Sequence, residues 1–118
     1  MSTDRELLEL AAKAAGICLV WNDAEKPGYY SEWRGLPQWE EWDPLADDGD
    51  VMRLLLKISN THGRTTEVVI SGGISRVRIR DFNHGWEYCG IERHHDDHGA
   101  ATRRAIICAV AEIGRGMK

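Results

Sequence analysis

The sequence predicts a single α+β domain over residues 1–118, in which a mostly antiparallel sheet of four or five strands packs with three helices. Three segments place apolar residues at the spacing of amphipathic helices, and short β-branched runs bounded by turn residues lie between them. The expected element order is α-β-β-α-β-β-β-α. Hairpins with helices that return to cover them form an α+β sandwich, which suits a chain of 118 residues.

The first helix is expected at about residues 4–15. Thr3 and Glu6 have the spacing of a capping box, in which each satisfies a free backbone amide of the other. An apolar face follows, and Gly16 provides the left-handed residue that commonly ends a helix. The β-branched and aromatic run at 17–22 then predicts the first strand.

A second strand is expected at 29–35, where it can pair back on the first. Residues 36–49 contain two prolines and show no steady period, which predicts an ordered loop. The acidic run at 47–50 then begins the second helix, because carboxylates cap and stabilise the positive end of a helix dipole. Its buried stripe is expected to comprise Val51, Leu54, Leu55 and Ile58.

Three short strands are expected at 66–71, 75–82 and 86–92. Glycine and asparagine between them favour hairpin turns, because both residues accept positive φ angles. The middle strand alternates with a period of two, so its aliphatic and basic side chains should face opposite sides of the sheet. The aliphatic residues are Val77 and Ile79, and the basic ones are Arg76, Arg78 and Arg80.

The last helix has the most regular apolar pattern in the chain, and Gly114 lies near its expected end. The expected buried stripe consists of Thr102, Ala105, Ile106, Ala109, Val110 and Ile113.

Composition excludes some classes of protein. The net charge is −4, divided into −6 over residues 1–63 and +2 over residues 64–118, which opposes binding to nucleic acid unless basic groups share one face. No apolar run could span a membrane or serve as a signal peptide, so a cytoplasmic protein with reduced, buried cysteines is expected. No nucleophile elbow, phosphate-binding loop or cofactor motif occurs, so neither an enzyme nor a cofactor is expected.

Three segments together resemble small phage and prophage proteins of the uncharacterised phage "ABA sandwich" domain type. These segments are "LLELAAKAAG" (7–16), "WDPLADDGDVMRLLLK" (42–57) and "ATRRAIICAVAEIGR" (101–115), and they cover 41 of the 118 residues. The resemblance implies a phage or prophage origin, expression in the cytoplasm of a bacterial host, and a sandwich fold. It implies no catalytic residues, because members are largely of unassigned function.

The run "HHDDH" (94–98) is a candidate metal site for a metal-dependent hydrolase, with His94, His95, Asp96 and His98 as its ligands. Ligands must converge on one point, however, and neighbouring residues of a loop diverge. A solvated loop in which Asp97 caps the last helix explains the run more simply. His62 and His84, both in expected turns, could in principle approach to complete a coordination shell.

Five aromatic residues, Tyr29, Tyr30, Trp33, Trp39 and Trp42, fall within 14 residues of the chain. Because the sequence has one phenylalanine, these side chains could supply the core. Tryptophan and tyrosine are also the side chains that most often anchor protein interfaces. Both interpretations stay open at this point.

Together these features favour a non-enzymatic phage or prophage accessory protein that acts by binding a host or phage protein. A homodimer is a further expectation. The alternative is a nucleic-acid-binding module that uses the face formed by Arg76, Arg78 and Arg80. Cross-strand acids such as Glu67 and Glu87 would instead neutralise these arginines, and nucleic acid is therefore not the expected partner.

Overall fold

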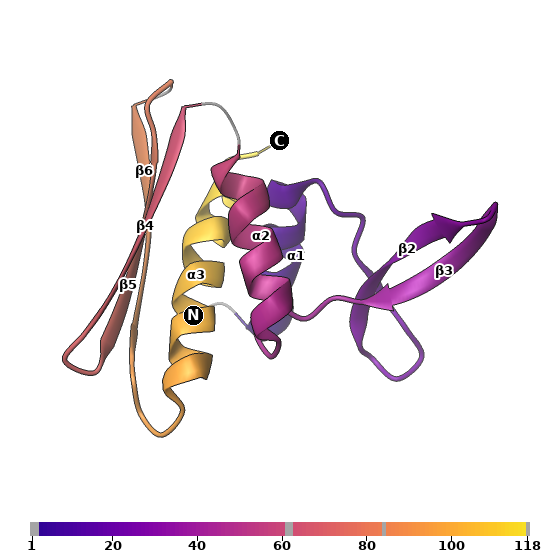
Figure 1. The fold of residues 1–118 in the computed structure, drawn as a ribbon, viewed down its shortest axis with the longest axis horizontal. Coiled ribbons are helices and arrows are strands. Elements are labelled where there is room, and N and C mark those ends of the chain that lie inside the picture. Colours follow the sequence, from indigo (N-terminus) through magenta and orange to yellow (C-terminus); the bar gives the residue numbers. More distant parts are fainter. Residues whose placement is uncertain (1–2, 61–62, 84, 118) are drawn as a thin grey trace.

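The computed structural model describes residues 3–60, 63–83 and 85–117, and these form three helices and two three-stranded antiparallel sheets. The helices are α1 (Asp4–Ala15), α2 (Asp48–Ser59) and α3 (His98–Arg115). The first sheet contains β1 (Val20–Trp21), β2 (Pro27–Trp33) and β3 (Leu36–Glu41). The second contains β4 (Arg64–Ser71), β5 (Ile74–Asp81) and β6 (Trp86–Arg93). Helix α3 lies between the second sheet and the other two helices, and the β2–β3 hairpin projects from the opposite side (Figure 1).

The α+β class with three helices is confirmed, but the expected single sheet of four or five strands is wrong. The strands divide into two separate sheets, and the expected loop contains the additional strand β3. Arg34 and Gly35 both have positive φ, 51° and 78°, which is the geometry of a tight hairpin turn that reverses the chain directly into β3. Pro37 is tolerated there because, within the described chain, β3 pairs on one side only.

The predicted N-terminal caps are confirmed, although among the described residues only the Thr3 half of the expected capping box with Glu6 forms. The side chains of Thr3, Asp47 and Asp97 accept hydrogen bonds from backbone amides three residues further along, at 3.1, 2.8 and 2.9 Å respectively. Gly16 ends α1 with a φ of 72°. Local chemistry of these short stretches therefore determines where each helix begins, independently of its packing partners.

The core lies where α3 meets its neighbours. On β5 the side chains of Val77 and Ile79 face α3 and are fully buried, as the period of two predicts. Gly90 of β6 has no room for a side chain, because a Cβ atom there would overlap the carbonyl oxygen of Ala105 in α3. Glycine at this position therefore lets the helix lie directly on the strand. The apolar residues of α1 and α2 cover the other side of α3.

The sequence also predicted that the three cysteines are buried. Cys18 and Cys89 are exposed and Cys108 is partly buried, so the expectation of buried thiols is wrong for the first two. Cys89 lies on the outer face of the second sheet, which none of the described helices covers. None of the helices within the described chain is long and apolar enough to cross a bilayer.

Candidate binding site

The β2–β3 hairpin carries large apolar side chains into solvent. Tyr30, Trp33 and Leu36 are 61%, 58% and 66% exposed. The hairpin extends away from the helices, so no other described element covers its tip (Figure 1). Because side chains alternate between the two faces of a strand, Trp33 and Leu36 lie on one face of the hairpin and Tyr30 lies on the other. Neighbouring large apolar side chains on a projecting element, such as Trp33 and Leu36, are typical of contact surfaces, whereas single exposed apolar residues are ordinary.

Pairing of the two strands determines which aromatic residues lie together. Tyr30 is directly opposite Trp39, and Trp33 is directly opposite Leu36. The indole of Trp39 lies over Gly28, where any Cβ atom would overlap it. The guanidinium of Arg34 lies 4.6 Å from the centre of a Trp33 ring and supports it from the turn. Trp39 therefore packs near the base of the hairpin, and Trp33 has its closest side-chain contact with Arg34 in the turn.

The five aromatic residues predicted for binding thus occupy three different environments. Tyr30 and Trp33 are exposed and Trp39 is half-buried. Trp42, in contrast, is 4% exposed and belongs to the core. Tyr29 packs against the core, and this burial, together with its cross-strand neighbour Glu40, raises the pKa of its hydroxyl. The candidate contact surface therefore contains fewer of these aromatic residues than the sequence indicated.

Leu36 is a member of this surface that the sequence interpretation missed. Leu36 lies in the segment that was expected to be a loop, and loop side chains are commonly exposed whether or not they bind a partner. The dipeptide Arg34-Gly35 was the available signal, because glycine favours the positive φ of a two-residue hairpin turn. Recognising that turn places Leu36 beside Trp33.

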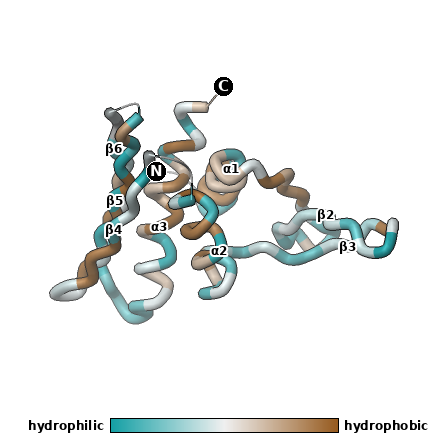
Figure 2. Tube along the Cα trace, turned by 45° about the horizontal axis from the view of Figure 1, so that its top comes forward, coloured by the Kyte–Doolittle hydropathy of each residue, from teal (hydrophilic) through white to brown (hydrophobic). Residues whose placement is uncertain are grey.

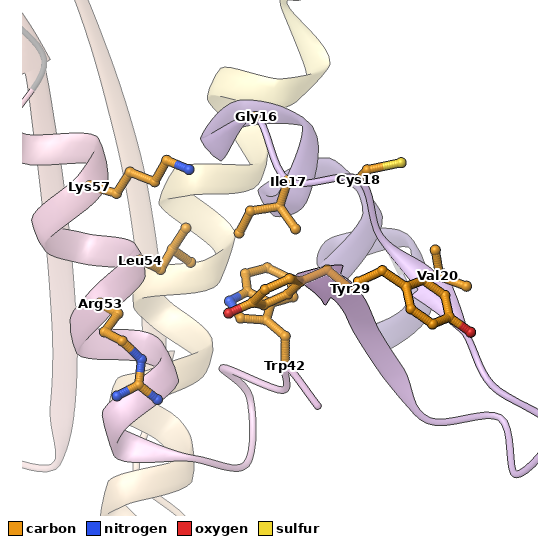
Figure 3. Close-up of a pocket in the computed structure, with 10 residues that line it drawn as sticks. Gly16, Ile17, Cys18, Val20, Tyr29, Trp42, Arg53, Leu54 and Lys57 are labelled. Atoms are coloured by element: carbon orange, nitrogen blue, oxygen red, sulfur yellow. The ribbon is translucent and has the colours of Figure 1, made fainter. Parts of the chain in front are cut away.

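A pocket of about 580 Å³ lies at the base of the hairpin, between β2, the segment after α1, and α2 (Figure 3). This volume is within the range of roughly 300–1,000 Å³ that small-molecule sites occupy. The segment that follows α1 is strongly hydrophobic, in contrast to the hydrophilic start of α2 (Figure 2). The lining residues that the argument uses are Ile17, Cys18, Tyr29, Trp42, Leu54 and Lys57.

Two cations of α2 line this pocket, and their situations differ. Arg53 donates to Asp50 at 2.6 Å and lies 3.7 Å from Asp47, so its charge is compensated. Asp50 is itself held in place, because it also accepts from the amide of Asp43 at 3.0 Å. Lys57, one helical turn further on, has no hydrogen bond or ion pair with any described residue. In Figure 3 its ammonium group extends towards the side of the pocket formed by Ile17.

The histidine run forms a hydrogen-bonded network. Nε2 of His94 lies 2.6 Å from Oγ of Ser75, and its Nδ1 lies 2.8 Å from Nδ1 of His98. The two rings therefore direct nitrogen atoms at one another and at a buried hydroxyl, while His95 and Asp96 are exposed. Within the described residues, no three His, Cys, Asp or Glu side chains are grouped so that they could hold a metal ion.

This network also does not form a serine nucleophile that a substrate could reach. Ser75 is fully buried, and its Oγ also lies 2.7 Å from Oγ1 of Thr102 in α3. The contacts join Ser75 of β5 and the residue that follows β6 to the first turns of α3, which is a structural role. His62 and His84, considered as additional metal ligands, lie outside the described residues.

The arginines of β5 share the outer face of the second sheet, as predicted. Glu87 of β6 lies 2.8 Å from Arg78 and 3.9 Å from Arg80, so the expected neutralisation by this acid is confirmed. Glu67 is opposite Arg78 on the other neighbouring strand. Arg76 has no ion pair with a described residue. Glu87 thus compensates the charges of Arg78 and Arg80 on this face.

DNA binding by this face is expected to be weak. Because Glu87 holds two of the arginines and the whole chain is acidic, duplex and single-stranded DNA should bind less tightly than the roughly 10⁻⁴–10⁻⁶ M of non-specific complexes near physiological salt. Fluorescence anisotropy with labelled oligonucleotides measures this affinity. Micromolar binding with a steep salt dependence, lost when Arg76, Arg78 and Arg80 are changed to alanine, would instead establish the nucleic-acid alternative.

Comparison with known proteins provides no relative. No protein-family model matches the chain, and no curated protein or solved structure is significantly similar to it. The resemblance to phage sandwich domains, and the phage origin that it implies, therefore stay predictions from the sequence.

Proposed function

We propose that the protein is a non-enzymatic binding module that contacts a partner protein through the tip of the β2–β3 hairpin. The observation that carries this proposal is the exposure of the directly opposite side chains Trp33 and Leu36 on an element that projects from the rest of the molecule. Aromatic side chains contribute most when a partner desolvates them completely. Trp33 is also held by Arg34, so little side-chain freedom is lost on binding.

The charges of the hairpin indicate the chemistry of this partner. Glu32 and Glu40 are exposed on the two strands, and Glu41, also exposed, lies 3.9 Å from Lys26. These acids lie on the strands behind the tip, while the guanidinium of Arg34 lies at the tip beside Trp33. An apolar cleft with an acidic group near Arg34 and basic groups further out is complementary to this arrangement, and such complementarity increases the rate of association. A host or phage protein with such a cleft is the proposed partner.

The proposed cellular context rests on the sequence resemblance alone. It places the protein among phage or prophage accessory proteins that work in the cytoplasm of a bacterial host. The homodimer expected from the sequence also stays a prediction. Neither point is needed for the hairpin to act as a contact surface.

The test compares capture of bacterial proteins by three immobilised forms of this protein. The wild type and the double variant Trp33→Ala/Leu36→Ala are compared with Met52→Ala/Leu56→Ala, which removes two α2 side chains that are 54% and 55% exposed. A specific partner should be captured by the wild type and the α2 variant but not by the hairpin variant. Titration of the purified partner should then show about 30-fold weaker binding to Trp33→Ala, as for an interface anchor.

Equal capture by all three forms would contradict the proposal. Loss of capture by both double variants would do the same, because it would indicate a surface other than the hairpin tip. Circular dichroism shows whether each variant keeps its fold, which is expected because all four side chains are exposed.

A further inference from the structure

We propose that the pocket at the base of the hairpin is a binding site for a small carboxylate with an aromatic or branched aliphatic body. This inference does not depend on the partner proposed for the hairpin tip, because Trp33 and Leu36 do not line the pocket, although Tyr30 of the same hairpin does. It depends on the volume of the pocket, its apolar walls, and one cation that no described residue neutralises.

The walls of the pocket come from elements that are distant in the sequence. Ile17 belongs to the segment after α1, Tyr29 to β2, Trp42 to the segment after β3, and Leu54 to α2. Trp42 and Leu54 are themselves buried in the core, so these parts of the wall are fixed before any ligand binds. Preformed walls of aromatic and aliphatic side chains suit a rigid apolar body, because little ordering accompanies its binding.

The charge of the pocket favours an anion. Lys57 brings a positive charge to the apolar wall, and no described carboxylate lies in ion-pair contact with it. The neighbouring cation, Arg53, is already held by Asp50 and Asp47. A ligand anion beside Lys57 would therefore form a charge-assisted hydrogen bond without displacing an existing ion pair.

The nearby acids limit the charge that the ligand can carry. Asp47 and Asp50 lie on the Arg53 side of the pocket, and Glu40 lies next to the hydroxyl of Tyr29. A dianion such as a phosphate monoester would be repelled by these carboxylates more strongly than a single negative charge would be. One uncompensated cation among several acids thus matches a monoanion, and a carboxylate is a compact monoanion that accepts charge-assisted hydrogen bonds.

Two probes of the same shape test this inference on the complete chain. 2-Naphthoate carries the carboxylate, and 2-naphthamide is its neutral analogue. Isothermal titration calorimetry at low ionic strength should show that naphthoate binds about three- to fivefold more tightly than naphthamide, because an ion pair with an exposed lysine contributes up to about 1 kcal/mol. The preference should decrease as salt screens the Lys57 charge.

Lys57→Gln should remove this preference while leaving the binding of naphthamide unchanged. Lys26→Gln is the matched control, because it removes the same charge from an exposed lysine that does not line the pocket. The control should keep the full preference. Lys57 is exposed and without polar partners among the described residues, so its replacement is expected to preserve the fold.

The two exposed cysteines report independently where the probe binds. Cys18 lines the pocket, whereas Cys89 lies on the outer face of the second sheet. Saturating naphthoate should slow the alkylation of Cys18 by iodoacetamide, followed by peptide mass spectrometry, and leave the rate at Cys89 unchanged. Absence of binding at millimolar concentrations, equal affinity for the two probes, an unaltered preference in Lys57→Gln, or equal effects at both cysteines would each overturn the proposal.

Discussion

Replacing Trp42 by alanine is expected to lower the free energy of unfolding by about 3–5 kcal/mol, as truncation of a buried aromatic side chain does. The indole of Trp42 is 4% exposed and is part of the hydrophobic core. Alanine would leave a cavity that the surrounding backbone cannot close completely. Because a domain has a total stability on the order of 5–15 kcal/mol, this one change should remove a large part of it.

Denaturant unfolding followed by circular dichroism measures this loss without relying on tryptophan fluorescence. Trp33→Ala is the matched control: the same truncation at a side chain that is 58% exposed should cost less than about 1 kcal/mol. Trp39→Ala, at a half-buried position, should lie between the two. A loss below about 1 kcal/mol at Trp42 would contradict its place in the core.

Gly90→Ala is expected to destabilise the protein by about 3 kcal/mol, the upper end of what overpacking usually costs. Its added methyl group would overlap the backbone of α3 at Ala105 and Ala109, which cannot move aside as a side chain can. The helix would have to shift away from the sheet. That shift would weaken the burial of Val77 and Ile79 on the neighbouring strand.

Gly116→Ala provides the control for this prediction. Gly116 has a φ of −81°, and a Cβ atom there would approach nothing more closely than the carbonyl oxygen of Ile113, at 3.7 Å. The change in unfolding free energy should be within about 0.5 kcal/mol. Similar destabilisation by both substitutions would show that the glycine at position 90 is not required for the contact between α3 and β6.

The helices and their ends could be predicted from the sequence because the interactions that define them are local. Capping by Thr3, Asp47 and Asp97 joins groups three residues apart, so a short stretch contains all the necessary information. The alternation along β5 is equally local. It predicted that Val77 and Ile79 would be buried on the face opposite the arginines.

The candidate site could be predicted only in part. The aromatic segment was identified correctly as a group, but its sequence could not show that Trp42 is buried while Trp33 is exposed. Both residues are tryptophans, and they lie close together in the chain. Their environments differ because the turn at Arg34-Gly35 carries one of them out on a hairpin and returns the other to the helices.

By itself, then, the sequence determined the α+β class, the three helices, their caps, and the faces of β5. Only the tertiary structure decided that the strands form two sheets, that the hairpin projects, and that Lys57 meets Ile17 and Leu54 around one pocket. Hydrogen bonds and side-chain periodicity act between near neighbours and are visible in a short stretch of chain. Pairing of strands and the meeting of pocket walls depend on contacts between distant residues, and many partners of similar hydrophobicity would satisfy them equally well.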